Sequence, residues 1–174
     1  DIIHVSKEYE IAIETALGGS ISNIVTDNEQ TAKSMIQFLK KNRFGRATFL
    51  PLTSIRGRRA ENADRICGEE GVIGLASDLI RVDSQFGHLA DYLLGRVFIV
   101  DHIDHALALA KKYRYSLRIV TLEGESLNPG GSLSGGAYKN TGNLLGRHRE
   151  MEELQKHVET LRKEGASLKQ QINQ

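Results

Sequence analysis

The chain has 174 residues, of which 40% are hydrophobic and 26% are charged, a composition that fits a folded globular protein and excludes disorder as the dominant state. Its 23 basic and 22 acidic residues leave a net charge of +1, so any attraction to nucleic acid must come from local patches. No run of about 18 apolar residues predicts a membrane span, and the single cysteine, Cys67, excludes an internal disulfide and a cysteine-based zinc site.

The first half of the chain predicts a helix, a strand, a second helix and a second strand. Residues 8–17 have an amphipathic helical pattern, and the β-branched pair at 24–25 predicts a short buried strand. The second helix is expected over residues 28–38, with Asp27 or Asn28 as its N-cap and Gly45 ending it in the left-handed conformation. A strand at 47–50 follows. The apolar residues expected on one face of this helix are Ala32, Met35, Ile36 and Leu39.

The second half repeats this plan. It predicts a helix over 86–94, a strand over 97–100, a helix over 102–110 that Asp101 caps, and a strand over 117–120. The pattern Lys-Lys-x-Arg-aromatic stands between helix and strand in both halves, at 40–44 and 111–115. A strand–helix–strand order favours parallel pairing. We therefore expect a mixed α/β (α+β) fold of two similar α/β subdomains, residues 1–80, with a long irregular connection at 51–71, and residues 81–149.

The end of the chain predicts a coiled coil. Apolar residues recur there at spacings of three and four, which is the seam of a heptad repeat, and charged residues fill the other faces. We interpret residues 150–174 as the start of a coiled-coil arm; the alternative is a terminal helix packed on its own domain. The sequence begins at Asp1 without an initiator Met, so we expect this chain to be a piece of a longer protein. The seam residues are Met151, Leu154, Val158, Leu161, Leu168 and Ile172.

Residues 124–136 are rich in glycine and allow several interpretations. A phosphate-binding P-loop needs a Lys and a Ser or Thr after its last glycine, and here Ala137 and Tyr138 follow. Residues 133–136 (Leu-Ser-Gly-Gly) look like the signature loop of ABC-type ATPases, but the chain has no Walker A motif. We interpret the segment as a short strand with a bare edge that accepts a strand from another chain; an intrachain turn with a bulge is the alternative. The predicted interface residues are Gly124, Gly130, Gly131, Leu133, Gly135 and Gly136.

Clustered basic residues are candidates for DNA contact. Lys40-Lys41 and Lys111-Lys112 fall at helix ends, where the helix dipole explains them. The remaining clusters lie in the long connection and around the start of the terminal helix, and they would bind phosphates weakly, with salt sensitivity and without sequence preference. The candidate contacts are Arg56, Arg58, Arg59, Lys139, Arg147 and Arg149.

The histidines do not predict a catalytic or metal site. His102 and His105 lie three residues apart beside Asp101 and Asp104, but the sequence offers no fourth convergent ligand, so we interpret them as a solvated helix start. No Ser-His-Asp arrangement follows from spacing. We therefore predict no catalytic residue, no bound metal and no cofactor for this chain.

Taken together, these segments resemble the hinge domain of bacterial SMC (structural maintenance of chromosomes) proteins. The resemblance is carried by residues 9–18, 45–52, 128–136 and 143–147, and it extends over nearly the whole chain. It implies two mixed α/β subdomains and a ring-like homodimer with two interfaces, at which the family's glycines lie. In this chain those glycines correspond to the run that ends at Gly135 and Gly136. Where relatives carry a basic cluster after this pair, Lys139 stands alone.

The resemblance also implies the function of a longer protein. The hinge would join two coiled-coil arms of an ATPase for chromosome condensation and segregation in the cytoplasm, at the nucleoid, and would bind DNA weakly. ATP and the kleisin partner would bind at head domains outside these residues, and the chain itself would not be an enzyme. Two alternatives from other classes are a fragment of an ABC-type ATPase and a monomeric DNA-binding domain.

Overall fold

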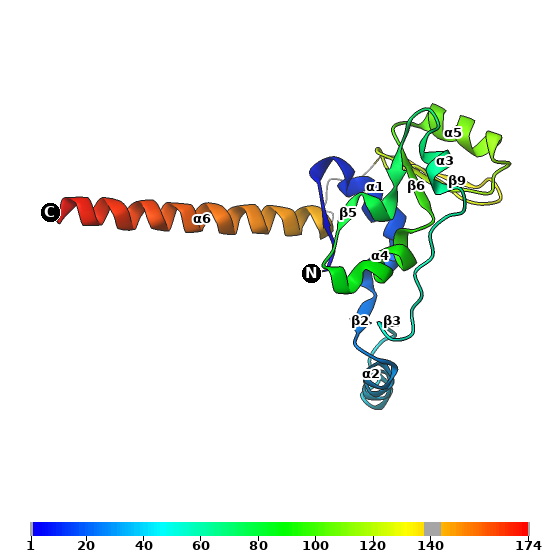
Figure 1. Ribbon diagram of the computed structural model, residues 1–174. Helices are drawn as coiled ribbons and strands as arrows, with labels where there is room; N and C mark the ends of the chain where they lie inside the picture. Colours follow the sequence, from blue (N-terminus) through cyan, green and yellow to red (C-terminus); the bar gives the residue numbers. More distant parts are fainter. Residues whose placement is uncertain (1, 138–143, 174) are drawn as a thin grey trace. The chain divides into compact units, whose positions relative to one another are not determined.

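The computed structural model describes residues 2–137 and 144–173, and its contacts divide the chain into two units, Asp1–Lys139 and Asn140–Gln174. The first unit contains strands and helices in a mixed α/β arrangement, which confirms the predicted fold class (Figure 1). The second unit contains the long helix α6 (Leu144–Ile172). The subdomain boundaries near residues 80 and 150 stay predictions.

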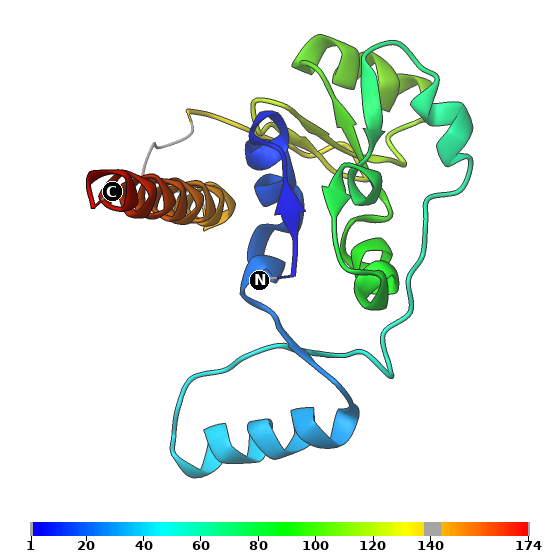
Figure 2. The same cartoon turned by 60° about the vertical axis from the view of Figure 1, so that its left-hand side comes forward.

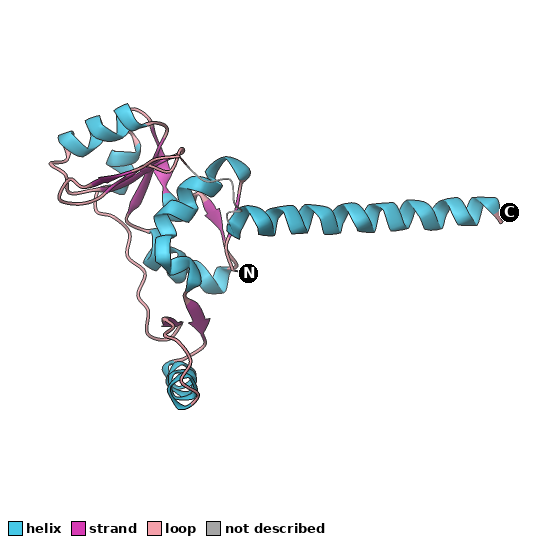
Figure 3. Ribbon diagram, turned by 180° about the vertical axis from the view of Figure 1, so that it is seen from behind, coloured by secondary structure: helices cyan, strands magenta, loops and turns pink. Residues whose placement is uncertain are grey.

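The largest sheet carries the second predicted half. Strands β6 (Val97–Val100) and β7 (Arg118–Thr121) pair in parallel and are joined by helix α5 (Ile103–Lys112), as their order predicts. The other neighbours in this sheet pair antiparallel. The full order of the sheet in the described residues is β4 (Val72–Leu75), β6, β7, β8 (Ser126–Leu127) and β9 (Leu133–Ser134). Figure 3 shows strands in magenta and the helices beside them in cyan.

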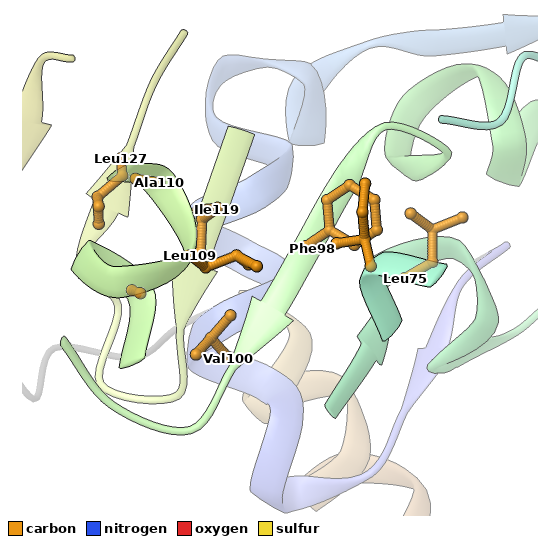
Figure 4. Close-up of a cluster of buried hydrophobic side chains, with 9 residues drawn as sticks. Leu75, Phe98, Val100, Leu109, Ala110, Ile119 and Leu127 are labelled. Atoms are coloured by element: carbon orange, nitrogen blue, oxygen red, sulfur yellow. The ribbon is translucent and has the colours of Figure 1, made fainter. Parts of the chain in front are cut away.

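The main hydrophobic core lies between this sheet and the helices α5 and α3 (Ala63–Cys67). All four residues of β6 are buried, as expected for a continuous apolar run in a central strand. Burying each such side chain contributes about 1.5–3 kcal/mol. Figure 4 shows the cluster, in which the labelled side chains are Leu75, Phe98, Val100, Leu109, Ala110, Ile119 and Leu127.

Elements from the start of the chain pack on the second half. Strand β1 (His4–Val5) pairs antiparallel with β5 (Ile80–Arg81). Helix α1 (Glu10–Leu17) lies against β7 and α4 (Gly87–Leu94), and its predicted apolar face is buried. The two predicted halves therefore share their packing instead of folding side by side as separate bodies.

The first half keeps a small sheet of its own. Strand β2 (Ile24–Thr26) pairs in parallel with β3 (Phe49–Pro51), and α2 (Glu29–Lys41) connects them. The register places Val25 opposite Leu50. A small cluster of Leu50, Ile55 and Leu89 joins this sheet to α4. In Figure 2 the light-blue helix α2 is connected to the rest of the unit by the two chain segments at its ends. Both predicted parallel pairings are thus confirmed.

The repeated Lys-Lys-x-Arg-aromatic pattern closes the C-terminus of a helix in both halves. Arg43 and Arg114 take the left-handed conformation, with φ of 54° and 55°. The N–H of Phe44 then donates to the carbonyl of Leu39 at 3.0 Å, and the N–H of Tyr115 donates to Ala110 at 2.8 Å. These are the six-residue bonds of a Schellman ending.

The sequence places two helix-capping residues one or two positions away from where the structure has them. Gly45 does not take a positive φ, because Arg43 already supplies the left-handed residue that ends α2. Likewise, the N-cap of α5 is His102, and Asp101 lies one residue before it. Asn28 is the N-cap of α2, and its side chain accepts a hydrogen bond from the N–H of Thr31 at 2.9 Å.

Helix α6 exposes the whole predicted heptad seam. Its seam residues run from Met151 to Ile172, and each is exposed to solvent within this unit. A helix of 29 residues with a two-in-seven apolar stripe gains little from that stripe unless a second helix covers it. Among the described residues, no helix combines the length and apolar character needed to cross a membrane.

The connection at 51–71, predicted to be irregular, contains the short helix α3, whose Ile66 is buried in the main core. Arg59 holds the part of the connection before this helix to the rest of the unit. Its guanidinium donates two hydrogen bonds to the carboxylate of Asp78, at 2.7 and 2.8 Å, and a third to Asp91 at 3.3 Å. Close by, the N–H of Ala60 donates to the carbonyl of Gly95 at 2.7 Å. A Cβ at Gly95 would lie 2.1 Å from the carbonyl oxygen of Arg58, so only glycine lets the connection pass here.

We expect the substitution Asp78→Asn to destabilise the chain by about 1 kcal/mol at neutral pH, since it removes the charge from a half-exposed, bidentate pair. Hydrogen bonding to Arg59 lowers the pKa of Asp78 below its ordinary value of 3.8. A lowered pKa in the folded state means that the contribution exists above the ordinary value and is lost as the pH falls through the folded-state pKa. Urea unfolding at pH 7 and below about pH 4 should therefore show the difference from wild type shrinking in acid.

Glu61→Gln is the matched control, because this exposed carboxylate lies in the same connection. A loss of stability from Glu61→Gln equal to that from Asp78→Asn would contradict a specific role for the Arg59 pair.

Candidate self-association surfaces

Strand β9 forms an open edge of the five-stranded sheet. Among the described residues it pairs with β8 alone, with Leu133 opposite Leu127 and Ser134 opposite Ser126. Both of its residues are exposed, and Leu133 keeps 54% of its surface accessible. The structure therefore contains the short strand that the sequence predicted, and this strand has an apolar side chain and an uncovered edge.

The predicted interface glycines separate into two groups. Gly124, Gly130 and Gly131 have φ between 90° and 99° and lie in the turns that connect β7, β8 and β9. The N–H of Gly131, for example, donates to the carbonyl of Asn128 at 3.0 Å. Their conformation is therefore explained by intrachain turns, the alternative that the sequence left open. Their predicted contact with another chain stays a prediction.

Gly135 and Gly136 follow the edge strand directly. A Cβ on Gly135 would lie 3.0 Å from Cγ of Glu125, so a bulky residue there would disturb its own chain first. Gly136 has a φ of 144° and open space around it. Leu133 is a better position at which to probe the surface, because its exposed side chain can change without backbone strain.

A second uncovered surface lies on α2. Of the apolar face predicted for this helix, only Ala32 is buried, and Met35 and Ile36 keep 37% and 41% of their surface exposed. An open groove of about 500 Å³ runs between this face and β3, lined by Ala32, Ile36 and Phe49 among others. The expectation that the whole face is buried is wrong for the single chain, although the helix itself is where the pattern places it.

The two parallel strand pairs differ in how far other elements of the chain cover their edges and their helices. The strand pair β6–β7 has β4 and β8 on its edges, whereas β2–β3 has no further strand on either edge in the described part of the chain. On α5, Ala106 and Ala110 are fully buried, and on α2 the corresponding face is open. The uncovered apolar surface of the first unit thus gathers on the small sheet and its helix, which form the lower end of the unit in Figure 1.

The basic residues of the long connection have different partners. Arg59 is engaged by Asp78 and Asp91, so two carboxylates offset its charge. The guanidinium of Arg56 donates to the backbone carbonyls of Thr53 and Ile55, at 3.2 and 3.3 Å, which leaves its positive charge uncompensated.

The remaining candidates for DNA contact fall elsewhere. Arg58 is exposed beside Arg56 in the connection. Arg147 is exposed on α6, where Arg149 pairs with Glu153 at 2.8 Å. The structure thus places these arginines in two separate units, and Lys139 lies outside the described residues.

Comparison with known proteins assigns the chain to a family. The family model described as the SMC proteins flexible hinge domain matches residues 1–110. The chain belongs to the SMC hinge family. This confirms the resemblance seen in the sequence. Of residues 133–136, which look like an ABC-type signature, Leu133 and Ser134 form the edge strand β9.

Relatives and solved structures agree with the assignment. Curated proteins named chromosome partition protein Smc, from Clostridium kluyveri and Bacillus subtilis, are 44% and 43% identical over 91% and 99% of this chain. The chain spans only 14–15% of their length.

Two solved hinge domains have the same fold. A crystal structure described as an asymmetric dimer of the Geobacillus stearothermophilus SMC hinge domain has a TM-score of 0.86 and 39% identity, covering 97% of this chain and 69% of that one. The Pyrococcus furiosus SMC hinge domain has a TM-score of 0.66 and 31% identity, with 82% and 72% covered.

Proposed function

We propose that this hinge domain associates with a second copy of itself in a reciprocal, head-to-tail dimer. In this dimer β9 of one copy lies along the open edge of the β2–β3 sheet of the other, and Leu133 enters the groove beside α2. The observation that carries the proposal is that one chain offers both an uncovered edge strand and an uncovered sheet with an apolar groove. Each surface supplies what the other lacks.

The backbone of β9 is suited to accept a strand. The N–H of Asn128 donates to the carbonyl of Ser132 at 2.9 Å, so these residues form a hydrogen-bonded pair of the antiparallel ladder. The pattern alternates along an antiparallel ladder, so the N–H and carbonyl of the next residue, Leu133, are directed at the open edge. These two groups can bond to a strand of another chain without disturbing β8.

Reciprocal contacts close the assembly. When each copy places β9 on the other copy's small sheet, the same contact occurs twice about a two-fold axis and no surface is left to propagate a filament. Two such contacts separated by the body of each chain would enclose an opening. The heptad seam of α6 lies outside these contacts and remains available for a second arm helix.

A mixing experiment tests the reciprocal arrangement. We expect Leu133→Asp and Ile36→Glu each to weaken self-association at least tenfold, because each places a charge in both copies of the contact. A mixed dimer of the two variants has both charges in one contact and an entirely wild-type second contact. Sedimentation velocity over a dilution series should therefore show partly monomeric variants that associate again when mixed.

Leu107→Asp is the matched control, since this leucine on α5 is 43% exposed but lies outside both proposed surfaces. It should leave the dimer intact. If the Leu133→Asp and Ile36→Glu variants stay fully dimeric, or if mixing fails to restore association, the reciprocal contact is wrong.

We further propose weak, sequence-independent DNA binding by the long connection. The uncompensated charges of Arg56 and Arg58 support it, since phosphate contacts require cationic side chains that are not already paired. Lys139, Arg147 and Arg149 remain candidates from the sequence, although Arg149 would have to give up its ion pair with Glu153 to contact a phosphate. The offset charge of Arg59 makes it a structural residue in our proposal rather than a phosphate contact.

The salt dependence of binding tests this proposal. Fluorescence anisotropy with a random duplex at 50–200 mM salt should show the log–log slope for Arg56→Gln/Arg58→Gln reduced by about 2, because each substitution removes one cation that would neutralise a phosphate. Lys112→Gln is the control, because Glu69 already neutralises that lysine at 2.7 Å. Equal reductions for both variants would contradict a local contact. Measuring the monomeric Leu133→Asp variant as well distinguishes DNA binding by the dimer from that of an independent monomeric domain.

The names of the relatives suggest the wider role. We propose that the hinge joins the coiled-coil arms of a chromosome partition protein in the cytoplasm, at the nucleoid. ATP hydrolysis and kleisin binding would belong to domains outside these residues, and the hinge would have no catalytic activity of its own. The hinge dimer would join the two arms at one end. The domains at the other ends of the arms would therefore be connected to each other through this dimer.

A further inference from the structure

A cluster of metal-binding side chains lies where β6 leads into α5. Asp101, His102 and His105 each direct a donor atom into the same small region, and these atoms all lie within 4.8 Å of one another. The two imidazole rings stack, with their centroids 4.0 Å apart. Nothing in the dimer or DNA proposals uses these residues.

The ring of His105 is held in a defined orientation. Its Nδ1 bonds to the Asp101 carboxylate at 2.8 Å, and one face of the ring lies against Gly71. A Cβ at Gly71 would lie 2.3 Å from that nitrogen, and the φ of 79° at this position also favours glycine. The N–H of Asp101 donates to the carbonyl of Gly71 at 2.9 Å, which fixes the carboxylate and the ring relative to each other.

This arrangement leaves the other ring nitrogen of His105 available. A carboxylate that bonds one imidazole nitrogen is the usual partner of a histidine that binds a metal through the other. Here that other nitrogen, Nε2, lies 3.5 Å from a carboxylate oxygen of Glu70. The side chain of Glu70 is 88% exposed, so it is free to adjust. Glu70 is thus a further carboxylate beside His105 that the sequence did not reveal, and its exposed side chain would move to share an ion with His102.

We propose that this cluster binds a divalent transition-metal ion of the zinc class. Nitrogen atoms of His102 and His105 and the carboxylate of Glu70 would be the ligands, and Asp101 would orient His105 through Nδ1.

The donor set decides the class of ion. Two imidazoles with a carboxylate suit zinc, nickel or copper, whereas calcium and magnesium require sites dominated by oxygen. Zinc–nitrogen distances are about 2.0–2.1 Å, so the exposed ring of His102 must turn out of its stack with His105 to direct a nitrogen at an ion bound to Nε2 of His105.

Two features set the expected strength. The cluster is partly exposed, and it lies at the positive end of the α5 dipole, which disfavours a cation. Against this, the carboxylates of Asp101 and Glu70 surround the imidazoles with negative charge. We therefore expect the ion to bind with micromolar rather than nanomolar affinity. The bound ion would link residue 70 to the start of α5.

Calorimetric titration of the metal-free chain with zinc chloride tests the proposal. We expect one saturable site per chain, with affinity reduced at least tenfold by His102→Gln and also reduced by Glu70→Gln. Neither change should unfold the chain, because His102 makes no side-chain capping bond and Glu70 is exposed. Zinc should also raise the midpoint of thermal unfolding of wild type, and this shift should be smaller in both variants.

His157→Gln on α6 and Glu61→Gln in the connection are the matched controls, and each should bind zinc as wild type does. If no saturable binding is found, or if His102→Gln and His157→Gln bind zinc equally well, the proposal is overturned. Association of the chains in the mixing experiment is measured without metal, so either proposal can fail alone.

Discussion

A parallel pair of short strands cannot stabilise itself, and this constraint shapes the whole unit. Such a pair needs further strands on its edges and apolar cover on its faces, because its own hydrogen bonds and side-chain contacts are few. In the second half β4 and β8 flank β6–β7, while α5 and α1 pack beside it. The β2–β3 pair has α2 and the Leu50 cluster but open edges. In our proposal, a second copy of the chain supplies the cover that the β2–β3 pair lacks.

The connection between the halves shows how a segment whose regular structure is limited to the short helix α3 is held in place. Arg59 meets two carboxylates from different elements, and Ala60 bonds to the backbone of Gly95, so charge and close packing act at neighbouring residues. An exposed ion pair alone contributes little. Its role here is to fix the position of the segment that leads from the small sheet toward the larger sheet.

Local sequence patterns predicted the helices and strands well. The features that they missed depend on contacts between residues that are distant in the sequence. The β-branched pairs, the helical periodicities and the order of strand, helix and strand are properties of short windows, and both parallel pairings follow from them. The exposure of Ile36 could not be predicted, because an amphipathic face has the same pattern whether its cover comes from its own chain or from another. The pairing of Arg59 with Asp78 joins distant positions, so its cluster looked like a free basic patch.

The cluster at His105 depends on pairing between strands rather than on spacing along one helix. Residues 70 and 71 precede β4, Asp101 follows β6, and the antiparallel pairing of these two strands brings the segments together. The backbone bond from Asp101 to Gly71 extends that pairing by one step and places Glu70 beside the ring. A helix with two histidines is therefore only half of the arrangement. The other half comes from the end of the long connection, so an ion bound there would hold the connection to the sheet at its far end, as Arg59 does nearer its middle.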